Sequence, residues 1–156
     1  MKKLLLAMAA VAMGMGTAVA GDHEANIVVV THGSDTDAFW GVVRNAVNAA
    51  AEDTGADVQY RNPSTGDLNE MAALIEAATA QNPDGLVVSI PDANILGGPI
   101  KAAIDAGIPV ISMNSGADVS KELGAIMHVG QPEYDAGKGG GEKSKGLGLS
   151  LIHISE

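Results

Sequence analysis

Short apolar runs alternate with amphipathic stretches along most of this chain, and that alternation restricts the fold more than any other feature of the sequence. The runs that predict strands are residues 26–32 (NIVVVTH), 57–61 (DVQYR), 86–90 (LVVSI), 109–114 (PVISMN) and 125–130 (AIMHVG). Nearly continuous apolar strands that are separated by helices indicate a parallel sheet with helices on both faces. The predicted fold class is therefore α/β, with a doubly wound parallel sheet.

Amphipathic stretches between these runs predict the helices, each with a boundary signal. Residues 38–54 carry apolar side chains at helical spacing and stop before Gly55. Asp67 opens a second helix, and Glu70 three residues later resembles half of a capping box. Asp92, or the Asn two residues after it, is placed to cap a third helix.

Residues 137–148 are rich in glycine. Pro132, which precedes them, suits the first turn of a further helix. So many glycines weaken a helix, so we expect a poor one. The segment does not hold a phosphate loop, because Glu142 stands where that motif requires glycine before Lys143. No dinucleotide-binding GxGxxG motif is present either, and we expect no cofactor.

The first twenty residues have the pattern of a secretory signal peptide. Lys2 and Lys3 precede an apolar run at residues 4–16, and Ala18-Val19-Ala20 is a cleavage signal of small residues. A short membrane anchor is the alternative, although the run is too short to span a bilayer. We expect cleavage after Ala20 and export to the periplasm.

The last eight residues, 149–156 (LSLIHISE), do not continue the pattern before them. They match the translation of a transposase adapter that is used to prepare sequencing libraries. We therefore expect residues 149–156 to be an adapter-derived tail and the natural protein to be longer. The alternative is an apolar strand.

Charge and motifs exclude several function classes. The formal net charge is −10, and without the first 20 residues, which hold two Lys and no acid, it is −12. Acidic surfaces repel phosphate backbones, so no nucleic acid is expected as a partner. His23, His32 and His128 show no metal-ligand spacing, the chain has no Cys, and no catalytic constellation is present. We expect neither an enzyme nor a metal site.

The carboxyl ends of parallel strands are where such sheets bind ligands. That rule selects the loops at residues 32–39, 61–66, 91–94 and 114–117.

Four phrases in order, TDAFW, NPDGLVVSIPDA, AAIDAGIPVISMNSG and HVGQPEYDAG, resemble the periplasmic sugar-binding proteins of the ribose-binding type, which have the type I fold. The resemblance runs from about residue 27 to residue 139. It implies two lobes joined by a hinge of crossing strands, with a ligand closed between them. Residues 21–148 would then be the N-terminal lobe, incomplete and without the second lobe.

The resemblance also implies ligand-binding positions. The family places a polar residue and two adjacent rings in the loop after the first strand, which here are Asp37, Phe39 and Trp40. At the end of the fourth strand the family has an Asp-Arg pair, but here Asn114 and Ser115 stand there. This departure favours a different small polyol, sugar or signalling ligand over ribose. Rings grip the C–H faces of a sugar, and fixed polar groups bind its hydroxyls.

Most of these positions also have a purely structural interpretation. Trp40 fits the buried stripe of its helix, Asp37 and Asp92 fit helix caps, and Ser115 fits a turn. His32 ends the first strand, where it can reach ligand. The weaker candidates, near a hinge or rim, are Gln131 and Glu133.

The function that the resemblance implies is that of the substrate-binding component of an ABC transporter, which passes a small sugar or polyol to a membrane permease. The full-length protein is expected to be a monomer. The alternatives are a periplasmic sensor or chemoreceptor ligand-binding protein and an enzyme on the same fold. The effector domain of a sugar-responsive repressor would need a DNA-binding helix pair where the signal peptide stands.

Overall fold

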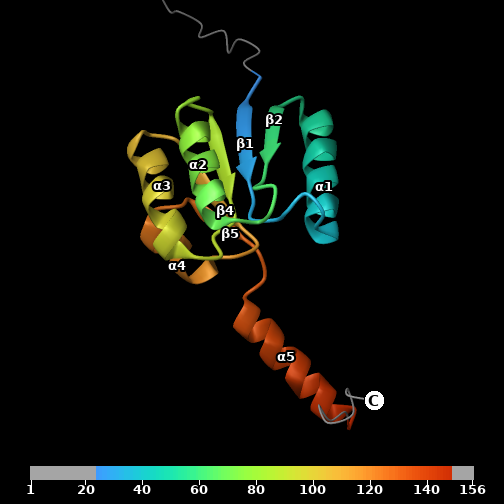
Figure 1. Ribbon diagram of the computed structural model, residues 1–156. Coiled ribbons are helices and arrows are strands. Elements are labelled where there is room, and N and C mark those ends of the chain that lie inside the picture. Colours follow the sequence, from blue (N-terminus) through green and yellow to red (C-terminus); the bar gives the residue numbers. More distant parts are fainter. Residues whose placement is uncertain (1–23, 149–156) are drawn as a thin grey trace, which may run out of the picture.

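The computed structural model describes residues 24–148 (Figure 1), so the predicted signal peptide and the predicted tail at residues 149–156 lie outside the described residues. Strands and helices alternate in the described part. The elements are β1 (Asn26–Val30), α1 (Ala38–Thr54), β2 (Asp57–Arg61), α2 (Leu68–Thr79), β3 (Gly85–Val88), α3 (Ala93–Asp105), β4 (Val110–Met113), α4 (Ala117–Leu123), β5 (Met127–Val129) and α5 (Glu133–Gly146).

The strands form one parallel sheet in the order β2-β1-β3-β4-β5, which confirms the predicted fold class. The chain steps from β1 to β2 on one side and then returns past β1 to β3. Because parallel crossovers are right-handed, this reversal puts α1 on one face of the sheet and α2, α3 and α4 on the other. Figure 1 shows α1 apart from α2 and α3, with the strands between them.

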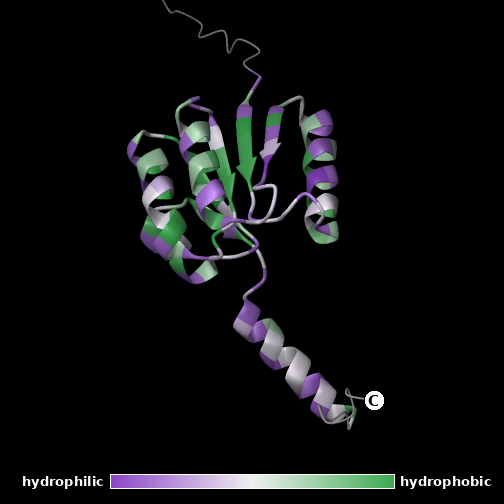
Figure 2. Cartoon of the chain, in the orientation of Figure 1, coloured by the Kyte–Doolittle hydropathy of each residue, from purple (hydrophilic) through white to green (hydrophobic). Residues whose placement is uncertain are grey.

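The hydrophobic core lies between the sheet and the pair α2 and α3, which pack against each other. Alternate strand residues point to this side because successive side chains of a strand point to opposite faces. Figure 2 shows β1 as hydrophobic along most of its length, whereas the neighbouring β2 is largely polar. The fully buried core residues include Val28, Val30, Leu86, Val88 and Val110 from the sheet and Met71, Ile75, Leu96 and Ile100 from the helices.

The opposite face of the sheet is less well covered than the sequence predicted. Ser112 and its neighbour His128 point toward α4, so Met127 and Val129 point toward the α1 side. Their side chains are 51% and 56% exposed. Of the residues of α1, only Trp40 is buried. Helices therefore cover one face well and the other only near β1 and β2.

The helix boundaries follow the predicted signals closely. Helix α1 ends at Gly55, whose φ of 71° is left-handed as expected for a glycine after a helix. Asp67 caps α2 by accepting from the amides of Asn69 and Glu70. The capping box is only half formed, since the Glu70 carboxylate accepts from the amide of Ser64 instead.

One helix was not expected, and the helix expected after Pro132 is more regular than expected. Helix α4 was not predicted, because its seven residues are too few to show a helical period. The glycine-rich segment forms a continuous helix, α5, which buries no side chain and projects from the carboxyl edge of the sheet (Figure 1). Figure 2 colours α5 as polar or neutral over most of its length. Within residues 24–148, no helix is both long and apolar enough to cross a membrane.

Candidate ligand-binding site

The loops at the carboxyl edge of the sheet are linked by backbone hydrogen bonds. The Ser89 amide donates to the Val30 carbonyl at 3.2 Å. The Ile90 amide donates to the Ser115 carbonyl at 3.0 Å, and the Asn114 amide donates to that of Val129 at 2.9 Å. These bonds hold the ends of β1, β3, β4 and β5 in one continuous rim.

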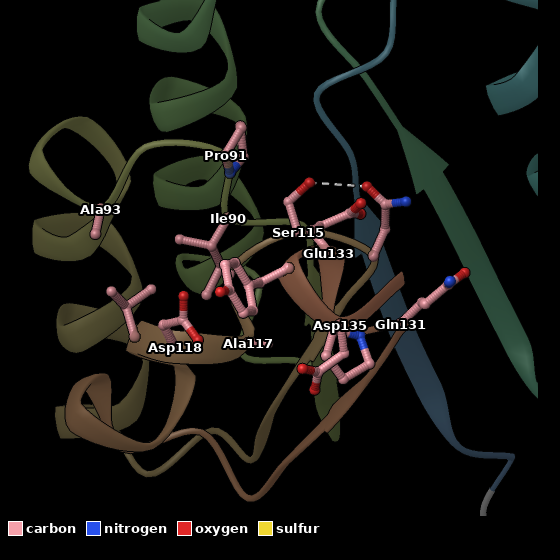
Figure 3. Close-up of a pocket in the computed structure, with 14 residues that line it drawn as sticks. Ile90, Pro91, Ala93, Ser115, Ala117, Asp118, Gln131, Glu133 and Asp135 are labelled. Atoms are coloured by element: carbon pink, nitrogen blue, oxygen red, sulfur yellow. Dashed lines mark hydrogen bonds between the residues drawn. The ribbon is translucent and has the colours of Figure 1, made fainter. Parts of the chain in front are cut away.

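A cavity of about 820 Å³ opens at this rim, between the ends of β3 and β4 and the start of α5 (Figure 3). Two of the predicted ligand-binding residues, Asn114 and Ser115, line it. The weaker candidates Gln131 and Glu133 line it too. The other lining residues are Ile90, Pro91, Ala93, Gly116, Ala117, Asp118, Val119, Pro132, Tyr134 and Asp135.

Asn114 adopts an unusual backbone conformation at the end of β4. Its φ is 61°, in the left-handed region, which non-glycine residues rarely occupy and Asn tolerates best. Its Oδ1 accepts a hydrogen bond from Ser115 Oγ at 2.8 Å, drawn as a dashed line in Figure 3. Gly116 follows with φ 99°, and a Cβ there would lie 2.5 Å from the Cβ of Ile90. The tight turn therefore presents an amide and a hydroxyl at the cavity wall.

Asp37 acts as the N-cap of α1, as its structural interpretation predicted. Its Oδ1 accepts from the amides of Phe39 at 2.9 Å and Trp40 at 3.3 Å. The two rings differ in exposure: Phe39 is 56% exposed and Trp40 only 3%. Phe39 is therefore the ring that is open to contact, and neither residue lines the cavity.

Trp40 belongs to the packed interior rather than to an open surface. Its ring meets the ring of Phe39 edge-on at 5.1 Å between centroids, and that of His32 at 4.9 Å. A Cβ at Gly33 would lie 2.2 Å from the Trp40 ring. The helical-stripe interpretation of Trp40 is confirmed, and its predicted contact with ligand stays a prediction.

His32 lies beneath the loop that carries Asp37. Its backbone amide donates to Ser89 Oγ at 3.0 Å, and its Nδ1 lies 2.9 Å from the same oxygen. Burial lowers the pKa of His32 below its ordinary value, and the Asp37 carboxylate partly opposes that shift. Burial therefore favours the neutral form of the ring, which is held by Ser89, directly after β3.

Asp92 caps α3, and its Oδ1 accepts from the amide of Asn94 at 2.8 Å. It does not line the cavity. Three polar lining residues were not singled out from the sequence. Asp118 lies on the unpredicted helix α4, whereas Asp135 and Tyr134, which is 81% exposed, lie within the phrase HVGQPEYDAG.

His128 contacts the neighbouring strand β4. Its Nδ1 lies 2.8 Å from Ser112 Oγ, which donates to Ser120 Oγ at 2.7 Å. Among residues 24–148, no group of three or more His, Cys, Asp or Glu side chains is placed to hold a metal ion.

Comparison with known families gives a match over residues 27–145, to the family described as periplasmic binding protein domain. Apart from Asn26 at the start of β1, that range contains the five strands and the loops at their carboxyl ends. The chain belongs to the periplasmic binding protein domain family. The resemblance seen in the sequence is thereby confirmed, and this periplasmic binding protein domain has the α/β fold expected of one lobe.

Solved structures and a curated relative resemble this periplasmic binding protein domain. A carbohydrate transporter from Acidothermus cellulolyticus in complex with myo-inositol is 37% identical, with a TM-score of 0.73 over 80% of this chain and 43% of that one. A periplasmic sugar-binding protein from Legionella pneumophila is 27% identical, with a TM-score of 0.74 over 79% and 45%. The ABC transporter periplasmic-binding protein YphF of Escherichia coli is 30% identical over 52% of this chain. The chain spans 25% of the length of YphF and less than half of either structure.

Proposed function

We propose that this chain is the N-terminal lobe of the substrate-binding component of an ABC transporter, which captures a small sugar or polyol in the periplasm and delivers it to a membrane permease. The observation that carries the proposal is the cavity beside Asn114 and Ser115 at the carboxyl edge of the sheet. The similarity to sugar transporter proteins over 79% to 80% of the chain supports it.

The lining of the cavity narrows the chemistry of the ligand. It offers carboxylates from Asp118, Glu133 and Asp135 and amides from Asn114 and Gln131. No Lys or Arg is among the described residues that line it. Carboxylates and amide oxygens accept hydrogen bonds, whereas an anionic ligand would need cationic donors. A neutral polyhydroxylated ligand fits this wall, and a phosphorylated sugar does not.

The proposed mechanism is capture by closure. A ligand that contacts this lobe and a second lobe stabilises the closed form, and the closed form docks on the permease. In this proposal the protein performs no reaction on its ligand. Residues 21–148 alone supply only part of the contacts, so we expect them to bind weakly or not at all.

The test begins with the gene, sequenced across and beyond the codon for Gly148 from a library made without the transposase. We expect the reading frame to continue into a second strand–helix lobe. The complete product is then titrated by calorimetry with myo-inositol, neutral monosaccharides and a phosphorylated sugar. Binding of a neutral member is the expected result. A frame that ends in LSLIHISE, or tight binding of the phosphorylated sugar alone, would overturn the proposal.

The variant Asn114→Gly separates ligand contact from backbone conformation. Glycine accepts the left-handed φ at no steric cost, so stability should be kept while the amide is lost. We expect affinity to fall about tenfold, which corresponds to one hydrogen bond of about 1.4 kcal/mol. The matched control is Asn82→Gly, since Asn82 is the other non-glycine residue with positive φ in the described part, φ 49°, before β3 at the opposite edge of the sheet. Equal ligand affinities of Asn114→Gly and Asn82→Gly would show that Asn114 does not contact the ligand.

A further inference from the structure

We propose that Asn62 is a positioning residue that holds the loop of residues 33–37 in place before any ligand arrives. That loop ends at Asp37, the N-cap of α1, and Phe39 lies in the first turn of that helix. Asn62 lies in the next loop at the same edge of the sheet, directly after β2. The effect on ligand affinity rests on the proposed function, whereas the effect on the loop does not.

The Asn62 side chain uses both ends of its amide to join two parts of the fold. Its Oδ1 accepts from Arg44 Nη2 at 2.6 Å, and its Nδ2 donates to Asp35 Oδ1 at 2.9 Å. The same Nδ2 donates to the Pro63 carbonyl at 3.0 Å, and Pro63 is fully buried. Arg44 on α1 and the Pro63 carbonyl therefore fix the orientation of the Asn62 amide, which donates to the Asp35 carboxylate from a fixed direction.

Arg44 is itself anchored, so the linkage leads into the body of the sheet. Its guanidinium carbon lies 5.1 Å from the centre of the Tyr60 ring on β2. The Tyr60 hydroxyl lies 2.7 Å from Thr31 Oγ1 at the end of β1. A cation over an aromatic face and a partly buried hydroxyl pair are both stabilising. Through Asn62, the exposed loop of residues 33–37 is therefore fixed relative to α1, β1 and β2.

A second connection runs parallel to the first. The Asp35 amide donates to the Ser64 carbonyl at 3.2 Å, and the Ser64 amide donates to Glu70 Oε1 at 3.2 Å on α2. Asp35 is thereby held through its side chain by Asn62 and through its backbone by Ser64. Surface loops are otherwise mobile, and a binding loop that is ordered in advance avoids an ordering cost on binding.

A single and a double variant, the latter with the hydrogen-bond donor and acceptor swapped between positions 62 and 35, test the linkage directly. In Asn62→Asp the new carboxylate still accepts from Arg44 but faces the Asp35 carboxylate, so the bond is replaced by repulsion. In the double variant Asn62→Asp with Asp35→Asn, the amide at position 35 donates to the carboxylate at position 62. The control for the added charge is Asn48→Asp, at an exposed position on α1.

Hydrogen exchange of the Asp35 backbone amide, measured on the full chain without ligand, is the primary measurement. We expect exchange to be about tenfold faster in Asn62→Asp, close to wild type in the double variant and unchanged in Asn48→Asp. Equal exchange in Asn62→Asp and the wild type, or a double variant as fast as the single one, would overturn the proposal.

Calorimetry on the complete gene product supplies the second measurement. We expect Asn62→Asp to weaken ligand binding and the double variant to restore it, a rescue that a general loss of stability would not produce. Faster exchange with unchanged affinity would overturn the role of Asn62 in binding. A wild-type protein that binds no neutral sugar or polyol would overturn the proposed function, while the exchange pattern still decides whether Asn62 holds the loop.

Discussion

At the scale of single residues, the loop after β1 depends on a close contact between Gly33 and the side chain of Trp40. Gly33 lies against the Trp40 side chain at a distance that leaves no room for a methyl group. The nearest atoms include the Cβ of Trp40, which cannot move without moving the backbone of α1. Gly33 is therefore required by packing, not by a positive φ.

The first prediction concerns Gly33→Ala. The added methyl group must displace Trp40, so we expect a loss of stability of about 1–3 kcal/mol, as for other overpacked sites. Trp40 is the single Trp of the chain, so its fluorescence should shift toward that of exposed indole. Urea denaturation followed by fluorescence measures both effects. Gly41→Ala is the control, because nothing lies within 4 Å of a Cβ there and Ala favours a helix.

His32 gives a second residue-scale prediction. Because burial lowers its pKa below 6.5, the unfolded chain binds a proton more readily than the folded one as pH falls. Above about pH 6.5 this difference in proton binding does not change the free energy of unfolding. As the pH falls below about 6.5, it lowers that free energy progressively. We expect the wild type to lose more stability than His32→Gln between pH 7.5 and pH 5.5, by urea denaturation at both pH values. An equal loss in the two proteins would show that His32 contributes nothing to it.

At the scale of elements, acidic residues cap the first three helices. Asp37, Asp67 and Asp92 each accept a hydrogen bond from an amide of the first turn. The amides of Glu70 and Asn69 hold the pKa of Asp67 below its ordinary value, since they stabilise the charged form. These caps fix where each helix begins, and hence where each loop at the carboxyl edge ends.

The prediction at this scale is that Asp92 has a structural role. Asp92→Ala removes the cap of α3 and should lower the free energy of unfolding by about 1 kcal/mol, while Asp92→Asn should keep most of it. Ligand affinity of the complete gene product should be the same in both variants and the wild type. Chemical denaturation and calorimetry measure the two quantities. A large loss of affinity in Asp92→Asn would instead make Asp92 a ligand contact.

Most helices and strands could be predicted from the sequence, because helix caps, glycines after helices and the spacing of apolar residues are local patterns of consecutive residues. Helix α1 and strand β2 have the predicted bounds. Helix α4 could not be found in this way, because it has no side-chain cap and follows Gly116. In the site, Asn114 and Ser115 followed from the rule on strand ends. The burial of Trp40 followed from the apolar stripe of its helix, whereas its contacts with His32 and Gly33 join segments that no local pattern connects.

At the scale of the whole molecule, the carboxyl edge of the sheet gathers the features that matter for binding. The cavity, the unusual turn at Asn114 and the linkage through Asn62 lie at this edge, and the exposed ring of Phe39 lies in the first turn of α1 beside it. At the amino edge, the described residues form turns and helix ends. The parallel order of the strands gathers at one edge the loops on which the proposed function depends.

Strand β5 has a further consequence for how the chain behaves in solution. It forms the edge of the sheet, and Met127 and Val129 project from its poorly covered side. An edge with open backbone groups beside exposed apolar side chains is a template for pairing with another copy. The net charge of −10 opposes such contacts through mutual repulsion, which salt screens. Self-association of this chain should therefore rise with ionic strength, and dilute, low-salt buffer is where it stays monomeric longest.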